Sequence, residues 1–234
     1  GELAKAHLAR LRERGSLRVV GITGSNGKTT TKDLLAAVVD GVVATRGNLN
    51  NAIGLPLTVL RADADTDVLV LEMGADAAGD LAYLTGIAPL DVAVVLGVGA
   101  AHVGRYASRE ALAHEKASIL AGLVPGGVAV LTADDAIVAR MASRVRDDAS
   151  LITFGTSAEA QVRATGVELD AGRASFAIDG VQISLSLVGE HHVTNALAAF
   201  AVARALGVEP QDAAARIGAA GPASPHRMAL TFRE

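Results

Sequence analysis

A glycine-rich run that ends in Lys-Thr-Thr lies near the start of the chain, at residues 21–30. An apolar stretch, 17–20, precedes it, and a helix-like pattern, 31–39, follows it. In a strand–loop–helix unit, N–H groups of the loop and the first helical turn converge on one spot and favour an anion there. A lysine at the end of such a loop reaches terminal phosphates, and the next hydroxyl can bind Mg²⁺. The run therefore predicts a site for the phosphates of ATP or GTP.

The candidate nucleotide-binding residues of this loop are Gly24, Ser25, Asn26, Gly27, Lys28, Thr29 and Thr30. Its glycines would let the backbone turn tightly and approach a phosphate. The strict phosphate-loop pattern has glycine five places before Gly27, where this chain has Ile22. The alternative is a structural turn that happens to contain Gly-Lys-Thr, but the flanking strand and helix favour a phosphate loop.

The elements that would position this loop alternate between β-rich and helical patterns. The predicted strands cover 17–23, 41–45, 68–73, 92–98, 128–131 and 151–154, and the predicted helices cover 31–39, 79–86, 108–122 and 134–146. Continuous apolar strands suit a parallel sheet that is buried on both faces. The alternation predicts an α/β fold with a doubly wound, mostly parallel sheet. Ligands of such a sheet bind beyond the carboxyl ends of its strands.

Three polar residues, two near those strand ends and one in a helical pattern, are candidates for metal binding or acid–base chemistry. Glu72 closes an apolar run, where either a Mg²⁺-binding acid or a carboxylate bonded to loop amides is expected. His102 follows the next strand, in a glycine-rich loop. It could be a metal ligand, an acid–base group or a histidine that caps loop carbonyls. Lys116 lies within a helical pattern among apolar neighbours, and most helix lysines are solvated.

Two further segments could bind a substrate or the nucleotide. An Asn-rich turn includes Asn50 and Asn51, which could hold polar groups of a substrate or serve as caps and turn formers. Asn195 lies one turn inside a predicted helix, where asparagine is mildly unfavourable, so a binding role is plausible. The adjacent His191 and His192 indicate a metal only weakly, because neighbouring helix residues face different ways.

The pattern changes after residue 154. Short strands are predicted at 161–168, 174–178 and 181–187, and the last two are joined by Asp-Gly, a strong hairpin signal. This segment predicts a small antiparallel appendage, and helices return at 193–206 and 210–220. Residues 2–14 read as one charged amphipathic helix.

Bulk composition limits the function classes. The chain has 234 residues, half of them hydrophobic, which is enough for one large domain or two small ones. The net charge is −4 and no long basic run occurs, which argues against nucleic acid as a partner. No apolar run reaches the length of a membrane span, and no signal peptide precedes the domain. We therefore expect a cytoplasmic protein, as a monomer.

The ordered set of motifs resembles the Mur ligases, ATP-dependent amide-bond-forming enzymes of peptidoglycan precursor synthesis. The resemblance runs from about residue 17 to 228, and the family's phosphate loop also lacks the first glycine. The Asn-rich run 48–57, the runs 71–75 and 101–102, and the segment 126–135 are similar to the members that add D-alanyl-D-alanine to UDP-N-acetylmuramoyl-tripeptide. Single pieces are weak signals, but their order is specific.

The resemblance implies a role for each matching residue. Lys28 would contact the terminal phosphates of ATP, and Thr29 would bind one Mg²⁺. Glu72 and His102 would help to hold a second Mg²⁺ together with Lys116, the family's carbamylated lysine. For the remaining positions, Asn195 would contact adenine, Arg227 would be the linker arginine near the nucleotide, and Asn50 and Asn51 would face the peptide substrate. The catalytic set would be Lys28, His102 and Lys116.

The family's reaction would proceed in two steps, in which ATP phosphorylates the substrate carboxylate and the dipeptide amine then displaces phosphate from the acyl phosphate. The family has three domains. By the resemblance, residues 1–16 are a helical lead-in from an N-terminal domain, 17–220 form the central ATP-binding domain, and 221–234 are a linker and the start of a C-terminal domain. The isolated central domain is expected to be inactive alone.

Several positions depart from the family pattern. Gly97 replaces a polar residue, Ala117 and Ser118 replace Gly-Glu, His192 replaces asparagine, and His226 stands where glycine is common. Two alternatives therefore stay open. One is another member of the superfamily, such as a folylpolyglutamate synthase, which the Asn-rich turn disfavours. The other is a divergent, non-catalytic nucleotide-binding module.

Overall fold

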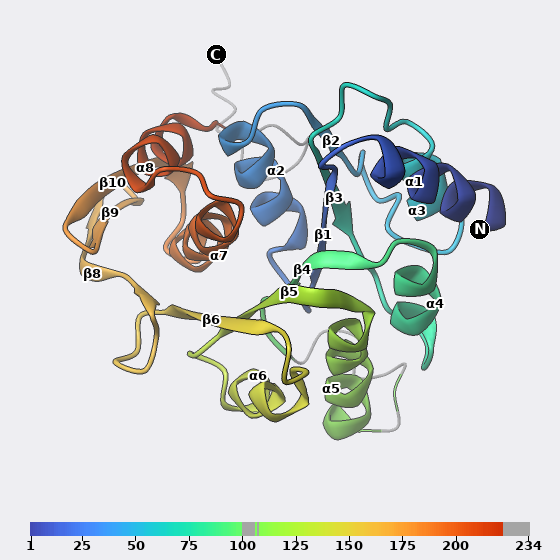
Figure 1. The fold of residues 1–234 in the computed structure, drawn as a ribbon. Coiled ribbons are helices and arrows are strands. Elements are labelled where there is room, and N and C mark those ends of the chain that lie inside the picture. Colours follow the sequence, from blue (N-terminus) through green and yellow to red (C-terminus); the bar gives the residue numbers. More distant parts are fainter. Residues whose placement is uncertain (100–105, 107, 222–234) are drawn as a thin grey trace, which may run out of the picture.

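A seven-stranded parallel sheet forms the centre of the molecule (Figure 1). The computed structural model describes residues 1–99, 106 and 108–221. The strand order is β2-β3-β1-β4-β5-β6-β7, and every neighbouring pair is parallel. The strands are β1 (Arg18–Thr23), β2 (Val42–Ala44), β3 (Val68–Glu72), β4 (Leu90–Val95), β5 (Leu123–Thr132), β6 (Ser150–Gly155) and β7 (Val162–Arg163). The prediction of a mostly parallel sheet is confirmed.

Helices cover both faces of this sheet, as a doubly wound fold requires (Figure 1). Helices α2 (Lys28–Val38), α7 (His192–Ala205) and α8 (Pro210–Ala219) lie on one face. The other face carries α1 (Glu2–Arg14), α3 (Gly54–Val59), α4 (Asp80–Ile87), α5 (Arg109–Ala117) and α6 (Ala136–Ala139). Alternate residues of β1 supply the two cores, with Val20 and Ile22 on the α2 face and Val19 on the α1 face. The strands are apolar on both sides because both sides are covered.

Two predicted helices end earlier than the sequence pattern indicates. Helix α5 gives way to a 3₁₀ segment, Ser118–Gly122, at the point where the Ser118 hydroxyl donates to the Glu115 carbonyl at 2.6 Å. A serine that bonds back to the preceding turn competes with the helical ladder. The helix predicted at 134–146 contains only α6 and a second 3₁₀ segment, Arg140–Arg144. Helix α3 was not predicted, since its residues read as the end of the Asn-rich turn.

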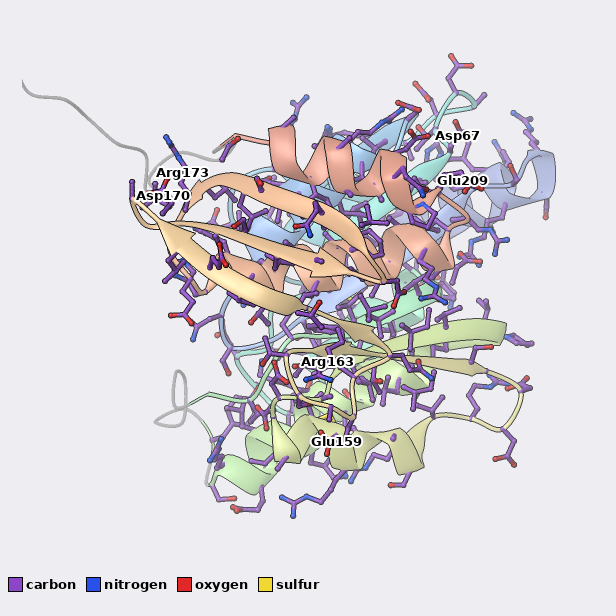
Figure 2. All side chains as sticks on the ribbon, turned by 90° about the vertical axis from the view of Figure 1, so that its left-hand side faces the viewer. Asp67, Glu159, Arg163, Asp170, Arg173 and Glu209 are labelled. Carbon is purple, nitrogen blue, oxygen red and sulfur yellow. The ribbon has the colours of Figure 1, made fainter. Side chains whose placement is uncertain are left out.

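A separate three-stranded antiparallel sheet forms the predicted appendage and packs against α8. Its strands are β8 (Thr165–Asp170), β9 (Arg173–Ile178) and β10 (Val181–Val188). The Asp-Gly hairpin is confirmed, since Asp179 and Gly180 both have positive φ, at 50° and 82°. Figure 2 views the molecule from this side and shows Asp170 and Arg173, which are cross-strand partners, at the turn between β8 and β9.

One predicted strand of the appendage is divided between the two sheets. The prediction placed residues 161–168 entirely in the antiparallel sheet, but Val162 and Arg163 pair in parallel with Phe154 and Gly155 of β6. Val162 is fully buried in the core shared with α7, which holds this part of the chain on the large sheet. The antiparallel sheet begins only at Thr165.

In the part of the chain that the structure describes, no helix combines the length and apolar character needed to cross a membrane.

Helix α1 is fastened to the sheet through Asp91 of β4. Arg12 donates to Asp91 Oδ2 at 2.6 Å, and the Val19 backbone N–H donates to the same oxygen at 2.8 Å. Helix α1 also buries Ala4, Leu8 and Leu11 against the fold. Asp91 therefore connects α1, β1 and β4 at the edge opposite the phosphate loop.

We predict that Asp91→Ala lowers the free energy of unfolding by about 1–3 kcal/mol, because it leaves a partly buried guanidinium and a strand N–H without their acceptor. Urea titration measures this change. The control is Asp148→Ala, which removes an exposed pair with Arg146 and should leave stability unchanged. Equal effects of the two substitutions would contradict the proposed link.

Candidate nucleotide-binding site

The loop between β1 and α2 has the backbone geometry of an anion site. Gly27 caps α2 with a φ of 84°, and Lys28 is the first helical residue. A Cβ at position 27 would lie 2.2 Å from Asn195 Oδ1, so no other residue fits without a rearrangement. The Lys28 ammonium donates to the Gly24 carbonyl at 2.8 Å, which folds this side chain back over the loop. The N–H groups at the start of α2 point to the same place.

Glu72 joins the phosphate loop to the Asn-rich turn. It is the last residue of β3 and is 4 % exposed. The Thr29 hydroxyl donates to one carboxylate oxygen and the Asn50 amide donates to the other, each at 2.9 Å. Both oxygens of the carboxylate therefore accept a hydrogen bond from a side chain. The Thr29 hydroxyl and the Glu72 carboxylate lie next to each other, and Mg²⁺ prefers such oxygen ligands.

Asn50 and Asn51 have different environments. Asn50 bonds Glu72 through its side chain and also accepts the Gly74 N–H on its backbone carbonyl at 2.8 Å. Asn51 Oδ1 accepts the N–H groups of Ile53 and Gly54, at 3.1 and 3.0 Å, at the start of α3. Asn51 thus forms a turn through its side-chain oxygen, in line with one of its two predicted alternatives, and the residue also lines a cavity.

Lys116 of α5 is buried, with 2 % of its surface exposed, so the interpretation of a solvated helix lysine is wrong. Burial, and then the nearby positive charge of Lys28, lower the pKa of Lys116 to about 8, while Glu115 acts in the opposite sense. An amine with this pKa is a better nucleophile at neutral pH than an ordinary lysine. The side chain faces the phosphate loop across a shared cavity.

This first cavity has a volume of about 470 Å³ and lies on the α4 side of the loop. Lys28 and Lys116 contribute two cations, Asn50 and Asn51 contribute amides, and Tyr83 belongs to the apolar part of the wall. Its remaining lining residues are Gly24, Ala52, Ile53, Gly74, Ala75, Asp76, Asp80 and Leu84. Two lysines and two aspartates thus line the cavity, with Lys28 beside the phosphate loop.

A second cavity, of about 500 Å³, lies on the α7 side of the same loop. Glu72, His191, His192 and Asn195 line it together with residues 25–30. Its floor contains Asn195, which is 5 % exposed. The loop is therefore accessible from two sides, with α7 on one and α4 and α5 on the other.

Several predicted site residues lie outside the described residues. These are His102 and Arg227, together with His226. Among the residues that are described, no three His, Cys, Asp or Glu side chains form a group that could hold a metal. The predicted Mg²⁺ ligands Thr29, Glu72 and Lys116 include only one residue of those types, so this finding does not bear on them.

Sequence reasoning missed two carboxylates that hold the site together. Glu115 is buried and accepts the N–H groups of Gly79 and Leu81 at 2.8 Å, which fixes the start of α4 against α5. Asp135 caps α6 and accepts the Val98 N–H at 2.8 Å. Glu115 had a signal in the sequence, since it directly precedes the candidate Lys116. Asp135 had the signal of an N-cap after a strand.

Comparison with known proteins identifies the class. Residues 22–203 match the model of the Mur ligase middle domain, and the chain belongs to this family. It is 43 % identical over 240 residues to the UDP-N-acetylmuramoyl-tripeptide–D-alanyl-D-alanine ligase of Mycobacterium tuberculosis. The aligned region covers 99 % of this chain and 46 % of that protein. The chain thus spans about half the length of the curated relatives it matches.

Solved structures show the same likeness. A crystal structure of MurF from Acinetobacter baumannii superposes with a TM-score of 0.91 at 32 % identity, over 99 % of this chain and 52 % of that one. MurF from Thermotoga maritima, which was crystallised in complex with ADP, gives a TM-score of 0.76 at 33 % identity, over 91 % of this chain and 50 % of that one.

We predict that Lys116→Met raises the free energy of unfolding at pH 7 by roughly 1–3 kcal/mol, because burial penalises the ammonium in the folded state. Between the folded pKa of about 8 and the usual 10.5, the unfolded chain holds more protons. The parent therefore gains stability as pH rises through this window, and the advantage of the variant shrinks.

Denaturant titrations between pH 7 and 10 in carbonate-free buffer test this prediction. Lys5→Met on the exposed face of α1 is the matched control and should show no such trend. An advantage of Lys116→Met that does not change with pH would mean that the buried amine is not the cause.

Proposed function

We propose that this chain is the ATP-binding part of a ligase that joins D-alanyl-D-alanine to UDP-N-acetylmuramoyl-tripeptide in peptidoglycan precursor synthesis. The main structural support is the bonding of Glu72 to Thr29 and Asn50, which brings a phosphate loop and a substrate-side turn to one carboxylate. The relatives that bear the name of this ligase supply the substrate identity. The reaction would form an acyl phosphate on the tripeptide, which the dipeptide amine then attacks.

The residues of the site fit ATP and Mg²⁺. We propose that the loop residues Gly24 to Thr30 bind the phosphates through backbone N–H groups and Lys28. Thr29, Glu72, Lys116 and His102 would hold Mg²⁺, with Lys116 as its carbamate. Bound Mg²⁺ would neutralise the charge that develops on the phosphate oxygens. Asn195 and Arg227 would contact the nucleotide outside its phosphates.

Lys28 and Lys116 would act on the substrate carboxylate as well as on the phosphates. Both line the first cavity, which Asp76 and Asp80 also line, so the attraction of a carboxylate would come from direct contact with the two ammonium groups and not from the net charge of the wall. The amides of Asn50 and Asn51 would orient the peptide at its rim. Holding carboxylate and phosphate side by side converts an encounter in solution into a reaction within one site, which is where most of the rate would originate.

The wider setting follows from the same proposal. A cytoplasmic location and a monomeric state fit a ligase of nucleotide-linked precursors. The whole ligase would need the parts of the longer relatives that this chain does not span, since about half of their length lies outside the match. The proposed division is a lead-in at 1–16, the ATP-binding domain at 17–220 and a linker at 221–234.

A non-catalytic nucleotide-binding module is the alternative that one observation favours. Gly97 stands where the family pattern has a polar residue, and among the described residues a Cβ there would meet only Asp135 Oδ2, at 3.7 Å. Among those residues, the site has room for a side chain that the sequence does not supply. Calorimetric titration with Mg-ATP tests whether nucleotide binds, and a ligase assay of the longer protein then separates a non-catalytic module from a ligase.

We predict that Lys28→Ala abolishes Mg-ATP binding and leaves thermal stability nearly unchanged, because Lys28 is the partly exposed first residue of α2 and does not belong to a core. Isothermal titration calorimetry gives the affinity, and Lys5→Ala on the exposed face of α1 serves as the control. The parent is expected to bind with micromolar to millimolar affinity, about −8 to −4 kcal/mol. Parent-like binding by Lys28→Ala would show that the loop assignment is incorrect.

We also predict that this chain alone forms no detectable pentapeptide product from UDP-N-acetylmuramoyl-tripeptide and D-alanyl-D-alanine. Catalysis requires all reacting groups to be positioned together, and the chain covers about half of its relatives. Phosphate release is the measurement. Turnover at about 1 s⁻¹ or above, within the usual range of enzymes, would show that the domain is self-sufficient.

A further inference from the structure

Two side chains on the first turn of α7 lie directly beneath the phosphate loop. Asn195 Oδ1 faces Gly27, where a Cβ would approach it to 2.2 Å, and lies 3.5 Å from the Thr31 hydroxyl. The other end of the same amide, Asn195 Nδ2, lies 3.3 Å from His192 Nδ1. Both residues are buried, with 5 % and 3 % of their surfaces exposed. The amide therefore connects the phosphate loop to a histidine ring.

The orientation of this amide matters to the loop. Its oxygen can approach the Gly27 Cα–H closely, whereas an NH₂ group there would be a buried donor facing carbon. Thr31 cannot select the orientation, because a hydroxyl both donates and accepts. His192 can select it. When the proton is on Nε2, Nδ1 can only accept a hydrogen bond. Nδ1 can then bond the amide NH₂ group of Asn195 but not its amide oxygen, which is also an acceptor.

We propose that His192 is a positioning residue that fixes the side-chain amide of Asn195, so that the amide oxygen faces Gly27 and Thr31 and holds the phosphate loop against α7. The proposal rests on the proposed nucleotide site, because it assigns a consequence for nucleotide binding. It gives a role to a position at which this chain departs from the pattern of the family it resembles.

The surroundings of His192 keep it neutral, as this role requires. Burial, and then the positive charge of His191, lower the pKa of His192 to about 4. The His191 ring lies 4.0 Å away between centroids, and Lys28 and Glu72 are the other charged groups that line the adjoining cavity. His192 Nε2 is buried and has no hydrogen-bond partner among the described residues.

Two substitutions separate the ring nitrogens. In His192→Asn, the amide oxygen can take the place of Nδ1 and accept from Asn195, whereas in His192→Gln the amide reaches the place of Nε2 and the Nδ1 acceptor is lost. We expect His192→Asn to keep the parent's Mg-ATP affinity and His192→Gln to lose about threefold to tenfold, the effect of one neutral hydrogen bond. Calorimetry measures both, with melting temperatures as the control for folding. Retention by His192→Gln and loss by His192→Asn would overturn the proposal.

A measurement on the unaltered chain does not depend on whether nucleotide binds, and a variant serves only to assign one signal. Long-range ¹H–¹⁵N spectra of the histidine-labelled chain at pH 7 identify the tautomer of each of the six histidines, and His192 is assigned by the signal lost in His192→Asn. The proton on Nε2, with Nδ1 as acceptor, supports the proposal. The proton on Nδ1 overturns it. A parent that shows the Nε2 tautomer but binds no Mg-ATP would refute the proposed function and leave the positioning of Asn195 supported.

Discussion

The carboxylate of Glu72 is the constraint on which the site depends. A carboxylate with 4 % exposure at the end of β3 is costly unless donors surround it. Its donors come from α2 and from the turn before α3, through Thr29 and Asn50. Its own backbone N–H donates to the Thr45 hydroxyl at 3.0 Å, just after β2. One residue therefore fixes the relative positions of four neighbouring segments at the carboxyl edge of the sheet, three through its carboxylate and strand and the fourth through its backbone N–H.

The phosphate loop is consequently held from two sides before any ligand arrives. Thr29 fastens it to β3, and Asn195 lies against Gly27 from the direction of α7. The positive φ of Gly27 makes that second contact possible, because no side chain intervenes. A loop fixed in this way presents its N–H groups without further loss of conformational freedom, and such preorganisation makes electrostatic binding of phosphate effective.

Much of the fold could be predicted from the sequence, because hydrophobic periodicity and turn-forming residues are local properties of the chain. The apolar runs, the Gly-Lys-Thr loop and the Asp-Gly turn identified the parallel sheet, the β1–α2 unit and the hairpin. Element ends were less predictable where a side chain bonds back to the backbone, as at Ser118, or where burial decides sheet membership, as at Val162. Position within a strand or loop indicated Glu72 and Lys28, but their partners depend on tertiary structure. The burial of Lys116 had no local signal, since a helix lysine among apolar residues is usually solvated.

The burial of Lys116 connects the fold to the chemistry proposed for it. At pH 7 an ordinary lysine is neutral in fewer than about one molecule in a thousand, whereas a pKa of about 8 leaves roughly one in ten neutral. Only the neutral amine can react with CO₂ to form a carbamate. Carbamylation would replace a buried cation next to Lys28 by an anion, so the repulsion that helps to lower the pKa would become an attraction. The cost of burying Lys116 beside the positive charge of Lys28 is thus relieved by the modification that would create a metal ligand. Glu115 fixes α4 against α5, the helices on that side of the cavity.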